Sequence, residues 1–427
     1  MALVAAVAIL AVDTSPLGRY LLRLPAVITV AVGQEQGIRL DVPGFLAVRA
    51  EGRDRGLVVD GHRIGSGWLR LPGATLQVRP AAAGDYTLRL RPWGLIPWPP
   101  LRIRAVGVPR VSVGGQSIGL VLTPPGPLVV AEPRVPTFGG AVRSPGAAAG
   151  VQLGADILAV AGQRPLDTAQ VAAVTEEAGR SGASLPLEVL QRGIVRTRAV
   201  YPAYDVATHR YSLGLTLQRA VSGIGTLTFY DVSAQVFGAL GHIVVDETTG
   251  RPVVPATGQL LPSFVAGVQP SRDGFPGEKL GVLLAGAPPL GTVRINTTVG
   301  IFGRLLRVPV PGPVAEPLAV ALADQVHPGP ATLLTVVHGG VAGAFAVRVL
   351  QVDASGPAGG KGLVVQVTDP RLLRTSGGIV QGMSGSPIVQ GGRLVGALTH
   401  VYVNDPARGY GVLAEWMAKA AGLSGPD

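Results

Sequence analysis

The sequence predicts a mainly β fold that is divided among several domains. The chain has 427 residues, a length that usually corresponds to two or three domains. It contains 61 glycines and 37 prolines, which separate many short apolar runs, whereas long stretches with helical spacing are few. Apolar residues make up 47% of the chain and charged residues 15%, so that the chain can bury a large core instead of remaining disordered.

Charge and composition exclude several classes of function. The formal net charge is +10, but the arginines are scattered and aromatic residues reach only 5%, which argues against a nucleic-acid partner. Only three basic residues are lysines: Lys279, Lys361 and Lys419. The absence of cysteine excludes disulfides, thiol catalysis and cysteine metal sites. No closely spaced pair of histidine and glutamate ligands is present, and we expect neither a metal nor another cofactor.

Residues 1–24 open with an apolar run, Ala2–Val12, which Asp13 interrupts. A membrane-spanning helix needs about 20 apolar residues, so this run is too short to cross a bilayer. It has the length of the apolar core of a signal peptide, although no basic segment precedes it. On its residues alone the run is compatible with a signal or membrane segment, and also with a buried strand or a disordered tail.

Residues 25–106 are predicted to form a small β-domain. Apolar and polar positions alternate over short runs such as Ala26–Val32, Thr75–Val78 and Tyr86–Leu90, with glycine and proline between them. His62 falls in a turn, and the segment carries no recognisable chemistry. We therefore expect a role in interaction or positioning.

Residues 107–202 resemble a PDZ domain. The run Ser117–Leu122 lies where that fold has its carboxylate-binding loop and the adjoining strand, and an open strand edge there would bind an extended peptide. The predicted peptide-binding residues are Ile118, Gly119, Leu120 and Val121. Asp167 or Thr168 is expected to cap a helix over Ala169–Ala178. The alternative is a domain that only packs against its neighbour.

Residues 203–427 contain the candidate catalytic groups, centred on the turn Gly382-Met383-Ser384-Gly385. Glycines allow the backbone to bend tightly and to direct its N–H groups at one point. Ser384 is the candidate nucleophile, and the N–H groups of Gly382 and Ser384 form the candidate oxyanion hole. Ser386 is a poorer nucleophile because Pro387 follows it directly. The remaining alternative is a glycine hairpin with exposed serines.

A serine nucleophile needs a base, and histidine is the usual one near neutral pH. Of six histidines, His242 has the most suggestive context, because it follows the apolar strand and glycines of residues 237–241. His400 lies within an apolar strand and is expected to form a wall of the site or part of the core. The candidates for a carboxylate that orients the base are Asp246, Asp369 and Asp405.

Three stretches resemble the SpoIVB family of sporulation serine peptidases. They are TDPRLLRTSGGIVQGMSGSPIVQGGRLVGALTHVYVNDPARGYGVLAEW from Thr368 to Trp416, GTLTFYD with FGALGHIVVD between Gly225 and Asp246, and PRVSVGGQSIGLVL from Pro109 to Leu122. The resemblance implies a triad of His242, Asp369 and Ser384, with Asp369 15 residues before the serine. Because the chain order is then histidine, aspartate, serine, we expect a chymotrypsin-like double β-barrel over residues 203–427.

The resemblance also implies a biological role. Members of the family are exported into the space between the two forespore membranes, associate with membranes, and cleave themselves and a membrane-bound regulator of an intramembrane protease, which triggers processing of a sigma-factor precursor. The expected partners are therefore protein or peptide substrates, that regulator, and the chain itself through autoproteolysis. Two alternatives are an envelope quality-control serine peptidase and a non-catalytic PDZ scaffold.

Overall fold

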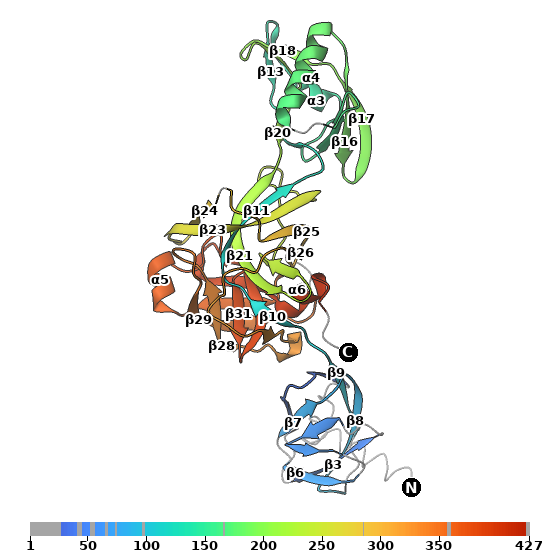
Figure 1. The fold of residues 1–427 in the computed structure, drawn as a ribbon, viewed down its shortest axis with the longest axis vertical. Coiled ribbons are helices and arrows are strands. Elements are labelled where there is room, and N and C mark those ends of the chain that lie inside the picture. Colours follow the sequence, from blue (N-terminus) through green and yellow to red (C-terminus); the bar gives the residue numbers. More distant parts are fainter. Residues whose placement is uncertain are drawn as a thin grey trace, which may run out of the picture. The chain divides into compact units, whose positions relative to one another are not determined.

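The structure, a computed structural model, describes residues 27–423 except for 41–44, 52–55, 65–66, 73–74, 96–98, 165–166, 285 and 357–359. The predicted signal segment lies outside the described residues. The predicted mainly β architecture is confirmed (Figure 1). In the described part of the chain, no helix is both long and apolar enough to cross a membrane. The chain divides into two compact units, one that ends at Pro109 and one over Arg110–Leu423.

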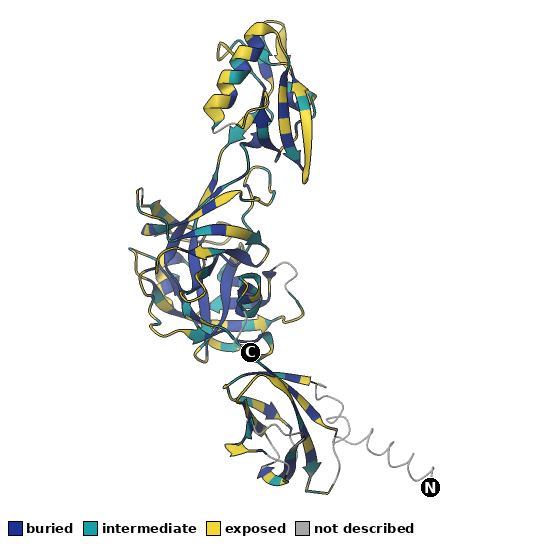
Figure 2. Cartoon of the chain, turned by 45° about the vertical axis from the view of Figure 1, so that its right-hand side comes forward, coloured by how far each residue is buried: buried dark blue, intermediate teal, exposed yellow. Residues whose placement is uncertain are grey.

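The N-terminal unit consists of two sheets that enclose one apolar core. Strands of both sheets, such as β7 (Thr75–Pro80) and β9 (Leu101–Val106), alternate buried and exposed positions, because successive side chains of a strand point to opposite faces (Figure 2). The five-stranded sheet has the order β1 (Val27–Ala31), β9 (Leu101–Val106), β8 (Gly84–Pro92), β3 (Phe45–Glu51), β6 (Leu69–Pro72). The four-stranded sheet has the order β2 (Gln36–Arg39), β7 (Thr75–Pro80), β4 (Leu57–Val59), β5 (His62–Arg63). This unit covers the residues for which the sequence predicts a small β-domain.

The second unit contains two β-barrels. In the first barrel, six strands form a closed ring, because β21 (Val221–Asp231) pairs with β22 (Val236–Ala239) on one side and with β11 (Ser117–Thr123) on the other. The ring order is β11 (Ser117–Thr123), β23 (Thr257–Gln269), β25 (Gly291–Thr297), β26 (Gly300–Leu305), β22 (Val236–Ala239), β21 (Val221–Asp231). Three further strands extend it: β24 (Glu278–Leu283) on β23, β10 (Arg110–Val113) on β21, and β27 (Leu318–Ala319) on β10.

The second barrel is a closed ring of six strands with its own apolar core. The ring order is β28 (Gly329–Thr335), β29 (Gly343–Val352), β30 (Leu363–Val367), β33 (Asp405–Leu413), β32 (Arg393–Tyr402), β31 (Pro387–Gln390). The short helices in this part of the chain are η1 (Ala323–Gln325), α5 (Pro370–Ser376) and α6 (Ala414–Ala420). A further apolar cluster joins residues of both barrels, including Phe229 of β21 and Leu394 of β32. The two barrels therefore share one packed boundary.

Residues between β11 and β21 form a separate module. Its sheet has the order β17 (Ile194–Val200), β16 (Leu185–Gln191), β15 (Asp156–Val160), β12 (Leu128–Ala131), β20 (Thr216–Gln218). Two hairpins and two helices complete it: β13 (Val135–Thr137) with β14 (Gly140–Val142), β18 (Ala203–Asp205) with β19 (Arg210–Ser212), α3 (Pro145–Ala148) and α4 (Thr168–Ser181). Asp167 caps α4, as the sequence predicts. The module is thus an insertion within the first barrel.

This topology corrects the predicted limits of the PDZ domain, residues 107–202, because the separate module lies between β11 and β21. It also corrects the predicted peptide-binding strand. Ile118, Gly119, Leu120 and Val121 lie on β11, which belongs to the first barrel and not to the inserted module. β11 pairs with β21 along one edge and with β23 along the other. Because both edges already carry backbone hydrogen bonds, this strand has no free edge for a peptide.

Candidate active site

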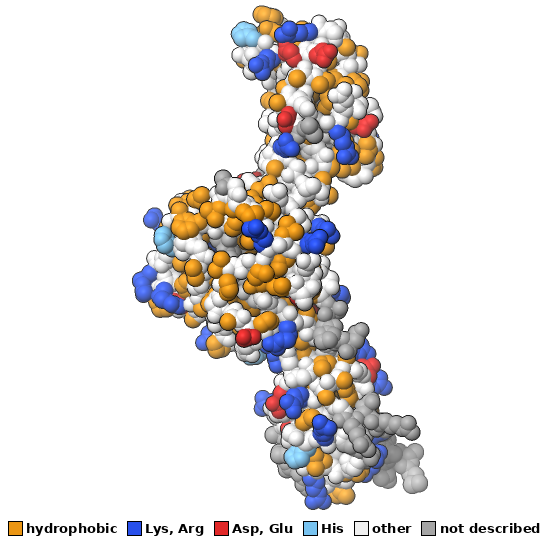
Figure 3. All heavy atoms as spheres, in the orientation of Figure 1, with side chains coloured by type: hydrophobic (Ala, Val, Ile, Leu, Met, Phe, Trp, Pro, Cys, Tyr) orange, Lys and Arg blue, Asp and Glu red, His pale blue; other side chains and the backbone are white. Residues whose placement is uncertain are grey.

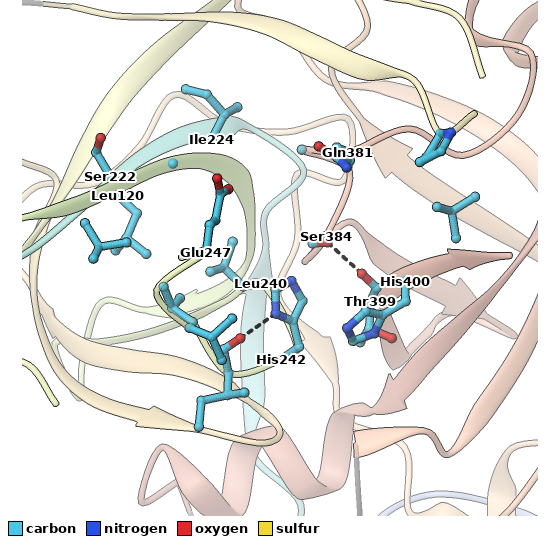
Figure 4. A pocket seen from close by; sticks show the side chains of 18 of the residues that line it. Leu120, Ser222, Ile224, Leu240, His242, Glu247, Gln381, Ser384, Thr399 and His400 are labelled. Atoms are coloured by element: carbon cyan, nitrogen blue, oxygen red, sulfur yellow. Dashed lines mark hydrogen bonds between the residues drawn. The ribbon is translucent and has the colours of Figure 1, made fainter. Parts of the chain in front are cut away.

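A cleft of about 720 Å³ lies between segments of the two barrels and holds the candidate catalytic residues. Ser384, Gly382 and His400 come from the second barrel, and His242 comes from the loop that follows β22 of the first barrel. Figure 4 shows Ser384, His242 and His400 together with Ser222, Ile224 and Glu247. The structure therefore brings His242 and Ser384, which are 142 positions apart in the sequence, to one cavity.

The turn around Ser384 depends on two glycines. Gly382 has φ +86° and Gly385 has φ +92°, a region that side chains with a Cβ rarely adopt. A Cβ on Gly385 would lie 2.1 Å from the carbonyl oxygen of Thr226 and 2.5 Å from the N atom of Leu240. The turn is therefore packed closely against the first barrel, which fixes the position of Ser384 relative to that barrel.

The N–H groups predicted for the oxyanion hole are free within the part of the chain that the structure describes. The N–H of Met383 donates to Val380, and that of Gly385 donates to Leu398. No hydrogen bond occupies the N–H of Gly382 or of Ser384, and both residues line the cleft. Backbone donors without a protein acceptor are uncommon at half-buried sites, and an arrangement of one on the serine and one two residues before it is typical of a site that stabilises an oxyanion.

The side chain of Ser384 is half-buried, whereas that of Ser386 is completely buried. The Ser384 hydroxyl donates a 2.6 Å hydrogen bond to the carbonyl of Thr399, which Figure 4 marks with a dashed line. Ser386 instead contacts the hydroxyl of Thr335 at 2.9 Å, beneath the turn. Ser384 is thus the serine that a substrate in the cleft can reach.

His242 is oriented by a backbone carbonyl. Its Nδ1 lies 2.8 Å from the carbonyl oxygen of Ile243, and because a carbonyl only accepts hydrogen bonds, Nδ1 carries the proton. The lone pair of Nε2 is then available to take a proton. Burial lowers the pKa of His242 below its usual 6.5, with the Ile243 hydrogen bond opposing this effect. The imidazole is therefore neutral at pH 7, as a general base must be.

His400 faces His242 within the cleft. The ring centroids are 4.9 Å apart, and Thr399, the neighbour of His400, holds the Ser384 hydroxyl. Burial, followed by the charges of His242 and Lys361, lowers the pKa of His400 to about 4. The sequence prediction that His400 forms a wall of the site agrees with this position, since the cleft is lined by His400.

Asp369 does not meet His242, contrary to the predicted triad. It caps helix α5, where its Oδ1 accepts from the N–H of Arg371 at 2.8 Å. The guanidinium of Arg371 donates to both carboxylate oxygens, and the N–H of Ala346 donates to Oδ2. The hydrogen bonds from Arg371 hold the pKa of Asp369 well below its usual range. Its oxygens are thereby occupied, and Asp369 does not line the cleft.

The acidic residues that do line the cleft are Asp246 and Glu247. Asp246 is buried, and its Oδ1 accepts from the N–H of Thr249, so that it braces a local turn. Glu247 is exposed. The predicted alternative Asp405 forms an exposed pair with Arg408, with 3.1 Å between Oδ2 and Nε.

Several residues behind the serine turn were not predicted from the sequence. Lys279, Thr226 and Thr335 come from β24, β21 and β28, and form a buried polar cluster with Ser386. Hydroxyl residues at distant positions give no local signal. Lys279 offered one, because it is one of three lysines in a chain whose other basic residues are arginines.

Comparison with known proteins adds a family match. Residues 209–418 match the family model described as SpoIVB peptidase S55. No curated protein matches the sequence. Among solved structures, the Rv3671c protease from M. tuberculosis in its active form is 16% identical with a TM-score of 0.26, over 49% of this chain and 78% of that chain. Its inactive form is 14% identical with a TM-score of 0.26, over 47% of this chain and 85% of that chain.

Proposed function

Through residues 209–418 the chain belongs to the SpoIVB peptidase S55 family, and on that premise we propose that it is a serine endopeptidase with Ser384 as nucleophile and His242 as general base. The observation that supports this most strongly is the pair of free N–H groups, on Gly382 and Ser384, beside a serine that the cleft exposes. Because no protein group among the described residues accepts from these donors and both residues line the cleft, the two N–H groups are available to an oxyanion bound there.

The proposed reaction begins when the Ser384 hydroxyl turns from Thr399 to His242 Nε2. Nε2 takes the proton while Oγ attacks the peptide carbonyl carbon, and the N–H groups of Gly382 and Ser384 stabilise the oxyanion. When the C–N bond breaks, His242 returns the proton to the leaving amine, and water then hydrolyses the acyl-enzyme. The carbonyl of Ile243 keeps the imidazole in the required tautomer.

The hydrogen bond between Ser384 and Thr399 has a consequence for activity. At 2.6 Å it holds the hydroxyl proton on a carbonyl that cannot act as a base. The described conformation therefore represents a resting site, and rotation of one side chain is required before attack. We propose that this rotation is a point at which the peptidase is controlled.

We further propose the finer role that the family resemblance implies. The chain would be exported, associate with a membrane in the space between the two forespore membranes, and cleave itself and a membrane-bound regulator of an intramembrane protease. The inserted module at residues 128–218 has the two helices and the antiparallel sheet expected of a PDZ-like domain, and would bind a peptide that controls the peptidase.

The test uses the purified full chain and the variants Ser384→Ala and Ser386→Ala, each treated with a fluorophosphonate probe. We expect labelling of the parent at Ser384, found by mass spectrometry, no labelling of Ser384→Ala, and retained labelling of Ser386→Ala. Fragments that appear in the parent but not in Ser384→Ala would establish autoproteolysis, and N-terminal sequencing would give the cleavage site. A folded parent that resists the probe at every pH would support the non-catalytic scaffold instead.

A further inference from the structure

Lys279 of β24 is buried directly beneath the serine turn and has no acidic partner. Only 5% of the residue is exposed, and no carboxylate in the described part of the chain forms an ion pair with it. Its Nζ lies 3.1 Å from Thr226 Oγ1 and 3.0 Å from Thr335 Oγ1. Burying a lysine without a counter-charge costs free energy of folding, which indicates that Lys279 has a role at this position.

The contacts of Lys279 lead to the backbone of the serine turn. Thr226 Oγ1, which accepts from Lys279, donates at 2.9 Å to the carbonyl of Gly382, and the N–H of Thr226 donates to the carbonyl of Ser384. The aliphatic stem of Lys279 packs against Gly382, where a Cβ would come within 3.1 Å of it. Thr226, which is hydrogen-bonded to Lys279, therefore holds the carbonyls of both Gly382 and Ser384.

The main chain of Lys279 aims one of the oxyanion donors. Its N–H donates at 2.9 Å to the carbonyl of Gln381. In a trans peptide the C=O and the following N–H point in opposite directions. Because the carbonyl of Gln381 points to β24, the N–H of Gly382 points away from β24, and that residue lines the cleft.

The hydrogen bonds around Nζ fit a neutral amine better than an ammonium. An ammonium has three N–H donors, and only two acceptor oxygens surround this Nζ among the described residues. A neutral amine has two N–H donors, which match the contacts to Thr226 Oγ1 and Thr335 Oγ1 and leave no third N–H buried without an acceptor. Arginine, which does not lose its proton in proteins, could not replace it.

We propose that Lys279 is a positioning residue of the serine site, and that it acts as a neutral amine which holds the oxyanion turn in its reactive geometry through Thr226 and Gln381. This inference rests on the proposed serine peptidase activity. Lys279 touches neither substrate nor reacting atoms; it determines how firmly the N–H groups of Gly382 and Ser384 are aimed.

The proposal makes the site sensitive to pH. Burial lowers the pKa of Lys279 to about 7. The groups that face Nζ from β21, β28 and the serine turn are uncharged hydroxyls, and Glu278 on the same strand is exposed on its other face. Below pH 7 the protonated amine would lose its fit to the cluster, and the turn would loosen. The rate of Ser384 acylation in the parent should therefore rise with pH, with a midpoint near pH 7. This midpoint is higher than the one expected if His242 alone controlled the rate.

The experiment compares the full chain with Lys279→Met, which keeps the length of the side chain, and with Lys419→Met, the same substitution at an exposed lysine of α6. Fluorophosphonate labelling of Ser384 is measured from pH 5 to 9. We expect Lys279→Met to label at least about tenfold more slowly at pH 8, since small misplacements of catalytic groups are that costly. Its pH midpoint should move below 6.5, to that of His242. Lys419→Met should match the parent.

Peptide hydrolysis, followed with a sequence taken from a self-cleavage site, gives a second readout. Because Lys279 does not contact substrate, kcat should fall while KM stays unchanged. Lys279→Met that labels at the parent's rate, with the parent's midpoint, would overturn the inference and leave the peptidase function intact.

A third readout does not depend on activity. Hydrogen exchange of residues 379–386 should be faster in Lys279→Met than in the parent at pH 8, and in the parent it should accelerate as the pH falls below 7. Circular dichroism checks that both variants are folded. If the parent is never labelled, the proposed function fails, and unchanged exchange in Lys279→Met would independently show that Lys279 does not hold the turn.

Discussion

The carboxylate of Asp369 accepts hydrogen bonds from the side chain and main chain of Arg371 and from the main chain of Ala346. Only 8% of its side chain is exposed. An aspartate that starts a helix and binds an arginine two residues later is a local structural device, and its sequence position gives no sign of which partner it chooses. Its distance from Ser384 along the chain was therefore compatible with a triad that the structure does not assemble.

Asp369→Asn tests which role is correct. Its depressed folded-state pKa means that the ionised form stabilises the fold above pH 4, and that this stabilisation is lost as the pH falls towards the folded value. We expect the free energy of unfolding at pH 7 to fall by about 1 kcal/mol, as for a paired helix cap, and the difference from the parent to shrink below pH 4. Chemical denaturation at pH 7 and pH 3 measures both effects.

Labelling of Ser384 should change less than about threefold in Asp369→Asn. Asp405→Asn, which removes an exposed Asp–Arg pair, is the matched control. A loss of about 10⁴ in rate with little change in stability would mean that Asp369 reaches His242 in a rearranged active state, as the predicted triad requires.

At the level of single residues, the sequence indicates those groups that stand in a recognisable local motif. Ser384 and the donors at Gly382 and Ser384 stand in a glycine turn, and His242 follows a strand and two residues with positive φ, Leu240 and Gly241. Lys279 and Thr335 could not be found in this way, because their role arises only when β24 and β28 pack beneath the turn. Their separations in the sequence from Ser384 exceed the range of any local pattern.

At the level of elements, the serine turn tolerates no side chain at Gly385. Gly385→Ala should combine a strained backbone at φ +92° with an overlap against the Thr226 carbonyl. We expect a loss of about 3 kcal/mol or more in unfolding free energy and a large fall in Ser384 labelling. Gly391→Ala is the control, since that glycine also has positive φ, +56°, but has open space around it. It should cost only about 1 kcal/mol, from backbone strain alone.

Equal losses of unfolding free energy in the two glycine variants, measured by urea denaturation, would contradict the packing argument.

Among the elements, one strand was assigned to the wrong domain from the sequence. The run Ser117–Leu122 has the apolar pattern of any buried strand, and that pattern does not reveal its partners. β11 finds them at β21 and β23, about 100 residues and more along the chain, so that a strand assigned to a PDZ domain belongs to a barrel.

At the level of the whole molecule, the insertion predicts that the peptidase can be separated from its module. Leu122 of β11 pairs directly with Val221 of β21, so a four-residue Gly-Ser turn between Thr123 and Val221 can replace the module as a hairpin loop. We expect this variant to fold, with Ser384 labelled within about tenfold of the parent rate. Gel filtration, circular dichroism and probe labelling measure the outcome.

Failure of that variant to fold would show that the barrel depends on contacts with the module.

The distribution of surface charge does not indicate a separate role for the module. On the face drawn in Figure 3, Lys and Arg side chains are scattered among apolar and polar ones. The cleft wall includes Leu120 of β11 and Val221 and Ser222 of β21, the two strands that connect to the module.

The place of the module also determines when the first barrel can close as the chain is made. β11 leaves the ribosome about 100 residues before β21, its partner in the ring, and joining strands across an unstructured loop of that length costs about 4 kcal/mol of chain entropy. Leu128 and Gln218, near the ends of the module, pair with each other. Once the module has folded, the ends of the loop are already neighbours and most of that entropy has been lost in an earlier step. The inserted domain would thus act as a folding intermediate built into the sequence, one that delivers β21 to β11 and shortens the period in which both strand edges are exposed to aggregation.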